Sequence, residues 1–314
     1  MAGIPVTAVI GPTATGKTRL AVEIALHFSG EVVSADSMQI YKGLSVGTAR
    51  PTAEEMRGVP HHLIGFLDPL RQFSVADYVD AASSCIRGIY ARKKLPVLAG
   101  GTGLYVSSLL SGLNFSPVGH NDMLRRQLKE KAEKEGPQTL VDELRSFDPE
   151  SAERIDGNNI KRLIRAIEIY RESGITMTEQ IRRSKMAPPA YDSAVIGLAY
   201  RDRDKLYKAI DSRVDMMMGR GLLDEAKQVY HLPGLSTAAQ AIGYKEFFPY
   251  FRGECSLEDS VEAVKRSSRR YAKRQLTWFR HKSGITWLFV DEFQSFEGLA
   301  AKSFEIIDGK GWKI

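Results

Sequence analysis

A short loop bounded by glycines near the start of the chain constrains the fold more than any other feature. A β-branched, apolar run at residues 6–10 leads into Gly-Pro-Thr-Ala-Thr-Gly-Lys-Thr. This is the spacing G-x-x-x-x-G-K-[ST], in which backbone N–H groups surround a phosphate chain while the lysine and the hydroxyl provide charge and a Mg²⁺ ligand. Apolar residues continue at helical spacing from Leu20 to Ala25, as a strand–loop–helix unit requires. The sequence therefore predicts a loop that binds a diphosphate or polyphosphate, with Thr18 as a metal ligand and the members Gly11, Pro12, Thr13, Ala14, Thr15, Gly16, Lys17 and Thr18.

Further β-branched runs repeat along the chain at residues 31–34, 96–99, 194–199 and 286–290. The segments between them are long enough to form helices, which is typical of α/β proteins with parallel sheets. Between two of these runs, Ser74 and Asp77 have the spacing of a helix-opening capping pair, and helical periodicity continues to residues 92–94. We predict an α/β fold with a mostly parallel sheet of the P-loop NTPase type, flanked by helices.

The segment from residue 119 to 189 differs from the rest, because 27 of its 71 residues are charged and none of it reads as a strand. A helix is predicted to start within Asp-Gly-Asn-Asn at residues 156–159 and to stop at Ser173-Gly174, with an apolar face at Leu163, Ile164, Ile167 and Tyr170. We therefore expect a small helical lobe at residues 119–189, inserted in a core made of residues 1–118 and 190–314. In the C-terminal part, helical patterns cover residues 204–230, 238–250 and 257–281.

Charge and composition narrow the class of protein. Hydrophobic residues make up 43% and charged residues 26%, as in ordinary globular proteins. No leader pattern or membrane-length apolar stretch is present. The two cysteines, Cys85 and Cys255, are not spaced as metal ligands. We expect a cytoplasmic monomer.

The net charge of +6 is concentrated in one place: residues 261–282 contain eight Lys or Arg and one acid. Five of the basic residues recur at helical spacing and so share one helix face. Tyr271, Trp278 and Phe279 lie in the same run, and basic residues interleaved with aromatics favour a polyanion such as nucleic acid over a merely solvated surface. The five are Arg266, Arg269, Arg270, Lys273 and Arg274.

Asp36 is the first acid to follow a predicted strand. The strand at residues 96–99, by contrast, runs into Gly-Gly-Thr-Gly without the carboxylate that commonly holds Mg²⁺ in hydrolysing P-loop enzymes. Ligands of doubly wound sheets sit at the carboxyl ends of the strands, so Asp36 is expected near the phosphate loop. There it can accept a proton from a hydroxyl in a kinase or from an amine in a transferase, or it caps a helix.

Taken in order, several motifs resemble the tRNA dimethylallyltransferase family. They extend over nearly the whole chain, and several are long enough to be specific on their own. They are residues 11–18, Ser-Ala-Asp-Ser-Met-Gln-Ile-Tyr-Lys-Gly at 34–43, Val-Gly-Thr-Ala-Arg-Pro at 46–51, Pro-His-His-Leu-Ile at 60–64, Ser-Val-Ala-Asp-Tyr at 74–78, Gly-Gly-Thr-Gly-Leu-Tyr at 100–105, Gln-Ala-Ile-Gly-Tyr-Lys at 240–245 and Ala-Lys-Arg-Gln-Leu-Thr-Trp-Phe-Arg at 272–280.

The resemblance implies transfer of a dimethylallyl group from dimethylallyl diphosphate to N6 of the adenine just 3′ of a tRNA anticodon. It implies that the phosphate loop holds the diphosphate of the donor, with Lys17, Mg²⁺ on Thr18 and the cation of Arg213 stabilising the leaving charge. Asp36 is then the base for the adenine amine, and Thr102 lies beside the amine and the base.

The resemblance also implies a set of tRNA contacts. Ser37, Met38 and Gln39 match the stretch that contacts the target adenosine, and Gln39 is a candidate to pair with the adenine edge. On the helical lobe and on the basic helix, the expected contacts are Arg125, Lys161, Arg162, Leu163, Ile164, Arg165, Arg266, Arg269, Arg270, Lys273 and Arg274.

Three alternatives remain open at this point. An adenylate isopentenyltransferase would prenylate free AMP or ATP, although it needs neither the basic face nor the helical lobe. A small-molecule P-loop kinase would use Asp36 as its base. A non-catalytic RNA-binding protein would use the loop only to hold a nucleotide.

Overall fold

The structure, a computed structural model, describes residues 3–112, 121–186, 190–233 and 237–312. It divides into two compact units, Met1–Leu109 with Tyr191–Ile314 and Leu110–Ala190. The predicted lobe boundaries at residues 119 and 189 lie outside the described residues. No helix within the described ranges is long and apolar enough to cross a bilayer.

The first unit is built on a six-stranded sheet in which every neighbouring pair of strands is parallel. All five strands predicted from the apolar runs are present, and β3 was missed because it is only two polar residues long. Parallel strands place their carboxyl ends at one edge, which is where the site lies. In spatial order the strands are β3 (His61–His62), β2 (Glu31–Ser34), β4 (Pro96–Gly100), β1 (Ile4–Ile10), β5 (Tyr191–Ala199) and β6 (Ile285–Phe289).

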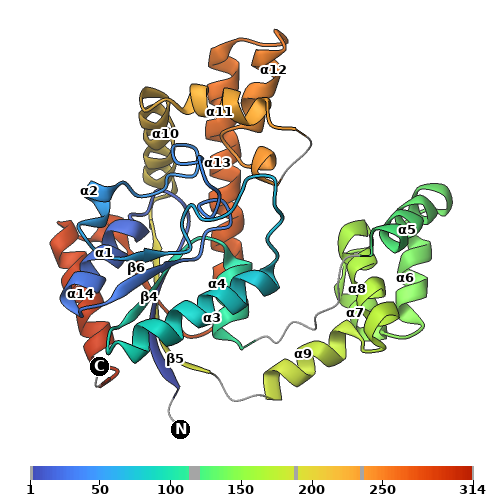
Figure 1. Ribbon diagram of the computed structural model, residues 1–314, viewed down its shortest axis with the longest axis horizontal. Coiled ribbons are helices and arrows are strands. Elements are labelled where there is room, and N and C mark those ends of the chain that lie inside the picture. Colours follow the sequence, from blue (N-terminus) through green and yellow to red (C-terminus); the bar gives the residue numbers. More distant parts are fainter. Residues whose placement is uncertain (1–2, 113–120, 187–189, 234–236, 313–314) are drawn as a thin grey trace. The chain divides into compact units, whose positions relative to one another are not determined.

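Helices from opposite ends of the chain cover the sheet. Helices α1 (Lys17–His27) and α14 (Phe296–Asp308) pack together in one apolar cluster with the strands, and Figure 1 shows them side by side in blue and red. Helix α3 (Val75–Ala91) packs on β1, β2 and β4. It begins at the predicted capping box, in which Ser74 and Asp77 bond reciprocally, so that prediction is confirmed. The shorter helices of this region are α2 (Ala53–Met56) and α4 (Gly103–Leu110).

The C-terminal part departs from two predictions. The helical pattern at residues 204–230 forms two helices, α10 (Arg203–Gly219) and α11 (Leu222–Tyr230), because Gly221 adopts a φ of 93° between them. The pattern at 238–250 is not one helix either, since Gly243 has a φ of 98° within it. It forms η1 (Ala238–Gln240), η2 (Lys245–Phe247) and α12 (Phe248–Phe251). The basic helix is confirmed as α13 (Leu257–Arg280), and a short η3 (Val290–Glu292) follows β6.

The described part of the second unit contains helices joined by turns, and no strand. Its apolar side chains form a core of their own, which includes Leu128, Leu144 and Leu163. The predicted helix of this lobe is confirmed, with Asn159 as its N-cap and Gly174 ending it at a φ of 69°. The helices are α5 (Asp122–Glu135), α6 (Gln138–Arg145), α7 (Pro149–Arg154), α8 (Ile160–Ser173) and α9 (Met177–Met186).

Candidate active site and nucleic-acid surface

The glycine-bounded loop connects β1 to α1, as the sequence predicts. Gly11 has a φ of 139°, and a Cβ on it would lie 2.2 Å from the carbonyl oxygen of Leu198, so only glycine fits. Gly16 is left-handed, with a φ of 81°, and is the N-cap of α1. The loop thus ends at a helix N-terminus, where unpaired N–H groups and the helix dipole favour an anion.

Three charged side chains share the space beside this loop. Burial and the Arg213 cation lower the pKa of Lys17 to about 7, while the Asp36 carboxylate opposes that shift. Burial also lowers the pKa of Arg213, on α10, and Asp36 again opposes the shift. The Nζ of Lys17 donates to the carbonyl oxygen of Pro12 at 2.5 Å. Lys17, Arg213 and Asp36 thus lie close enough to act on one another electrostatically, although they come from three separate parts of the sequence.

Asp36 follows β2 and holds a turn with one of its carboxylate oxygens. Its Oδ1 accepts from the backbone N–H groups of Met38, at 2.8 Å, and Gln39, at 3.3 Å. No hydrogen-bond partner of Oδ2 is found within the part of the chain that the structure describes. The capping role and the role of a proton acceptor are therefore compatible, because each can use a different oxygen.

Thr102 lies against the same turn. Its Oγ1 accepts from the backbone N–H of Ser37 at 3.0 Å, and its own N–H donates to the carbonyl oxygen of Ala35 at 3.1 Å. A Cβ on Gly100 would lie 2.2 Å from that same oxygen. The glycines before Thr102 therefore permit the close approach that brings its hydroxyl beside the Asp36 turn.

Two residues of α13 complete this region and were not predicted from the sequence. The Tyr271 hydroxyl lies near Thr102 and Gln275, and burial together with the charge of Asp36 raises its pKa to about 12. Gln275 is buried and bonds to the phosphate loop and to Gly101. The available signal was a glutamine at helical spacing with Ala272 and Phe279, on the apolar side of a basic helix.

The predicted role of Gln39 in pairing with adenine is not supported by its contacts. Its Oε1 accepts from the Ser34 hydroxyl at 3.1 Å. Its Nε2 donates to the carbonyl oxygens of Thr48 and Ala49 at 3.3 and 3.2 Å. Both ends of the amide are thus used to hold the following loop, and Gln39 is a structural residue in this conformation.

The surroundings of Thr18 suit a metal ion that is bound partly by the substrate diphosphate. Thr18 lines a small cavity of about 20 Å³ together with Ser34, Gln39 and His61, which is room for about one water molecule. Within the described ranges no three His, Cys, Asp or Glu side chains gather as a metal cage. Because Mg²⁺ usually keeps several waters and takes substrate phosphates as ligands, the Thr18 hydroxyl fits a cation that is bound partly by a diphosphate.

The basic face predicted on the long helix is present on α13, with one exception. Arg266, Arg270, Lys273 and Arg274 are exposed. Arg269 instead bonds to the Asp211 carboxylate at 2.6 Å and is only 26% exposed. Four cations of the predicted five therefore present their charge to the solvent, and the fifth connects α13 to α10.

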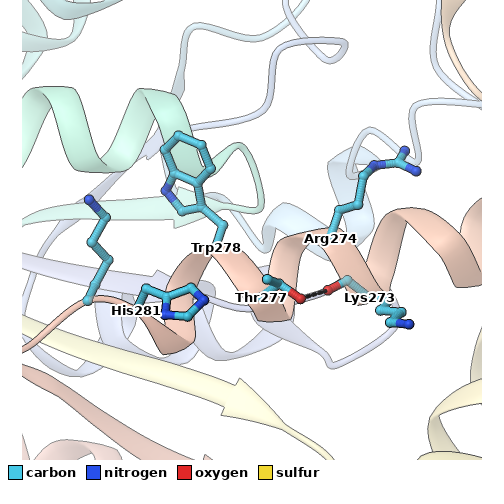
Figure 2. Close-up of a pocket in the computed structure, with 6 residues that line it drawn as sticks. Lys273, Arg274, Thr277, Trp278 and His281 are labelled. Atoms are coloured by element: carbon cyan, nitrogen blue, oxygen red, sulfur yellow. Dashed lines mark hydrogen bonds between the residues drawn. The ribbon is translucent and has the colours of Figure 1, made fainter. Parts of the chain in front are cut away.

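A shallow pocket of about 540 Å³ lies along the last turns of the same helix. Trp278 lines this pocket and is 41% exposed. Its Nε1 donates to the Ser107 hydroxyl on α4 at 3.0 Å. Figure 2 shows the indole directed toward α4, with Arg274 and Lys273 further along the helix. An exposed indole beside cations offers a stacking surface to a nucleic-acid base. The lining residues are Lys273, Arg274, Thr277, Trp278, His281 and Lys282.

The predicted RNA contacts of the second unit divide into two kinds. Lys161 and Arg162, on the first turn of α8, are exposed. The side chains of Leu163 and Ile164 are buried in the core of the unit, so the predicted contact is corrected to one that only their backbone could make.

Arg125 and Arg165 also have a structural partner. Both bond to the fully buried carboxylate of Glu168, at 2.7 and 2.6 Å, and each remains about a third exposed. The backbone N–H of Asn121 donates to the same carboxylate at 3.0 Å. Glu168 thus neutralises part of the charge that the resemblance assigns to RNA binding. These two arginines are members of an internal ion cluster, and their contact with tRNA stays a prediction.

Comparison with known proteins matches this architecture to one family over nearly the whole chain. The family model "IPP transferase" matches residues 39–282, and "Isopentenyl transferase" matches residues 4–65. The tRNA dimethylallyltransferase of Caldanaerobacter subterraneus is 44% identical over 310 residues, covering 98% of both chains. That of Bacillus subtilis is 45% identical over 307 residues, covering 98% of this chain and 97% of the other.

Solved structures give the same result. A tRNA isopentenylpyrophosphate transferase from Bacillus halodurans is 42% identical with a TM-score of 0.73, covering 98% of this chain and 96% of that one. A eukaryotic dimethylallyltransferase acting on tRNA is 28% identical with a TM-score of 0.84, covering 96% of this chain and 77% of that one. This chain, with its phosphate loop, its Asp36 turn and its basic helix in one core, belongs to the tRNA dimethylallyltransferase family of prenyltransferases.

Proposed function

We propose that this chain transfers the dimethylallyl group of dimethylallyl diphosphate to N6 of the adenosine just 3′ of a tRNA anticodon. The observation that carries the proposal is the arrangement of Lys17, Arg213 and Asp36 at the phosphate loop. A phosphate-binding cradle with two cations suits a leaving diphosphate, and a carboxylate beside it suits a nucleophile that must lose a proton.

The diphosphate side of the reaction uses the loop. As the bond between the allylic carbon and the diphosphate oxygen breaks, the electron pair and the growing negative charge go to the diphosphate. The N–H groups of the loop, the N-terminus of α1, Lys17 and Arg213 stabilise this charge. For Lys17 this requires its Nζ to leave the Pro12 carbonyl oxygen, which it contacts at 2.5 Å.

The acceptor side uses Asp36 and Thr102. The N6 amine is a weak nucleophile, because its lone pair is delocalised into the adenine ring. It forms the new C–N bond as its proton passes to a carboxylate oxygen of Asp36. Oδ2 suits this role, since Oδ1 is held by Met38 and Gln39. The Thr102 hydroxyl, which accepts from the N–H of Ser37, would orient the amine.

We assign Thr18 to Mg²⁺ held jointly with the donor diphosphate. The metal, when bound, neutralises charge on the diphosphate oxygens and so assists their departure. The Thr18 hydroxyl, at the second position of α1, is the protein ligand available for it.

The tRNA would lie on two sets of exposed side chains. On the first unit these are the four exposed cations of α13 and the pocket around Trp278. On the second unit they are Lys161 and Arg162. Contacts between such cations and phosphates provide affinity, whereas the adenine itself must leave its stack to reach Asp36, at a cost of a few kcal/mol.

One comparison tests the proposal against its rivals. The protein is incubated with labelled dimethylallyl diphosphate and with tRNA, AMP, ATP or no acceptor. Label in tRNA that digests to N6-modified adenosine supports the proposal. Label in AMP or ATP would instead identify a nucleotide prenyltransferase. Phosphoryl transfer from ATP without use of the prenyl donor would identify a kinase, and the proposal would be abandoned.

A further inference from the structure

Gln275 uses a single side-chain amide to join the two halves of the site. Its Oε1 accepts from the backbone N–H of Thr13 at 3.0 Å, and its Nε2 donates to the carbonyl oxygen of Gly101 at 2.9 Å. The residue is 6% exposed, so it does not lie on the face of α13 that an RNA would contact. We infer that Gln275 is a positioning residue that fixes the phosphate loop and Thr102 relative to each other.

The first contact fixes one peptide group of the phosphate loop at both ends. The N–H of Thr13 and the C=O of Pro12 belong to the same planar peptide unit. Gln275 holds the N–H, while the carbonyl oxygen accepts from Lys17 Nζ at 2.5 Å and from Thr15 Oγ1 at 2.9 Å. If the peptide rotated, the resting place of Lys17 would move with it. Gln275 therefore sets the starting position of the cation that meets the diphosphate.

The second contact, from Gln275 Nε2 to the Gly101 carbonyl oxygen, fixes a peptide group on the acceptor side of the site. The C=O of Gly101 and the N–H of Thr102 also form one peptide unit. Gln275 holds the oxygen, and the N–H donates to the carbonyl oxygen of Ala35 at 3.1 Å. The Cα of Thr102, which carries the hydroxyl side chain, is bonded to the nitrogen of this peptide. The direction of the hydroxyl toward Ser37 therefore depends on the orientation of the peptide plane.

The Gln275 amide lies close against the backbone of Gly101. A Cβ placed on Gly101 would lie 2.1 Å from Gln275 Nε2, well inside van der Waals contact. Both polar atoms of the amide have partners of the correct kind, and a buried amide with one end unsatisfied would be destabilising. The relative position of the donor side and the acceptor side of the site is thus fixed by a residue that touches neither substrate. This inference rests on the proposed function for the identity of those sides.

The test replaces the amide by an apolar group of similar length. In Gln275→Met, the single-turnover rate at saturating tRNA and donor is expected to fall about 10- to 100-fold, because small displacements of reacting groups are costly. Inorganic pyrophosphate, measured by calorimetry, is expected to bind at least about threefold more weakly, since the loop loses an anchor. The tRNA dissociation constant is expected to stay within about threefold, because the residue is buried. Ser260→Ala, which also removes a buried polar group from α13, is the matched control and leaves all three values unchanged.

A double-mutant cycle identifies the contact itself. Gly101→Ala alone is expected to reduce the rate, because its methyl group displaces the amide. In the Gln275→Ala background the same change is expected to cost much less, since the displaced atoms are gone. Additive losses would overturn the inference. So would a Gln275→Met protein with lowered melting temperature but normal rate and pyrophosphate affinity, or one that loses only tRNA affinity. Failure of the proposed function would appear separately, as a wild-type protein that binds pyrophosphate but modifies no tRNA.

Discussion

The backbone N–H of Ser37 donates to the hydroxyl oxygen of Thr102 at 3.0 Å, which joins the turn after β2 to the turn after β4. These residues are 65 positions apart in the chain. This bond brings the Asp36 turn beside a hydroxyl to which the family resemblance assigns a part in the same chemistry. The two turns belong to neighbouring strands of a parallel sheet, so their ends lie at the same edge.

Asp36→Asn should abolish transfer without unfolding the turn. The amide oxygen of asparagine can still accept from Met38 and Gln39, but it cannot take the proton. We expect the single-turnover rate to fall by about 10²–10⁴-fold and the tRNA dissociation constant to stay nearly the same. The matched control is Asp68→Asn, because Asp68 holds a similar exposed turn through Leu70 at 2.8 Å. Normal turnover in the Asp36→Asn protein would remove Asp36 from its role.

Diphosphate binding should be coupled to proton uptake by Lys17. In the free protein the pKa of Lys17 is about 7, because burial and Arg213 disfavour the charged form. A bound diphosphate favours the cation and raises this pKa, so above pH 7 binding must take up a proton. Affinity for pyrophosphate is then expected to fall as pH rises above 7, by up to about tenfold for each pH unit. Calorimetry in buffers of different ionisation enthalpy measures the proton count.

Lys17→Met serves as the reference for that experiment. Proton uptake by pyrophosphate itself is common to both proteins and cancels in the comparison. The variant is expected to bind more weakly at pH 7 and to take up about one proton fewer near pH 8. Equal proton counts in the two proteins would contradict the assignment.

The exposed cations of α13 should contribute to tRNA affinity through phosphate contacts. We expect the double variant Arg270→Gln/Lys273→Gln to weaken binding, and to flatten the slope of log K against log salt by about 0.7–0.9 for each lost contact. Arg269→Gln should change the slope less, because Asp211 already neutralises that guanidinium. Arg87→Gln/Lys302→Gln removes the same charge from exposed positions elsewhere and is the control. An unchanged slope in the first variant would mean that the basic face is only solvated.

Glu168→Gln should destabilise the helical unit. The substitution keeps the size of the side chain but removes the charge with which Arg125 and Arg165 pair at 2.7 and 2.6 Å. Removing one partner of a buried pair costs about 3–5 kcal/mol, and we expect the lower value because both guanidinium groups keep some contact with water. Urea unfolding of the full chain measures the effect. Glu150→Gln, which breaks only the exposed pair with Arg182, should cost little.

The same cluster predicts an acid-dependent loss of stability. Its hydrogen bonds and charges lower the pKa of Glu168 from 4.5 to about 2. The contribution of Glu168 is therefore complete above pH 4.5 and is lost as pH falls from 4.5 toward 2, as the carboxylate protonates. The difference in unfolding free energy between the wild type and Glu168→Gln is expected to shrink over this interval. A constant difference would show that the charge of Glu168 is not what stabilises the unit.

Features that depend on neighbours in the sequence were determined by the sequence itself. The phosphate loop, the five longer strands, the Ser74 capping box and the ends of α8 all follow from local spacing, because turns, caps and strand patterning use residues within a few positions of one another. The helical period even marked Leu163 and Ile164 as an apolar face, and their burial agrees with that pattern rather than with an RNA contact.

The tertiary structure alone decided what each polar side chain does. The Gln39 amide, predicted to pair with adenine, bonds to the backbone at Thr48. Arg125 and Arg165 form ion pairs with Glu168. Gln275 bonds to the carbonyl oxygen of Gly101, which is 174 positions away in the chain. A buried polar group must find its partner wherever the fold brings one, however distant in the chain. Residue type and spacing therefore show that a polar side chain is chemically able to bind a substrate. Only the packed fold shows whether that side chain already bonds to another part of the protein.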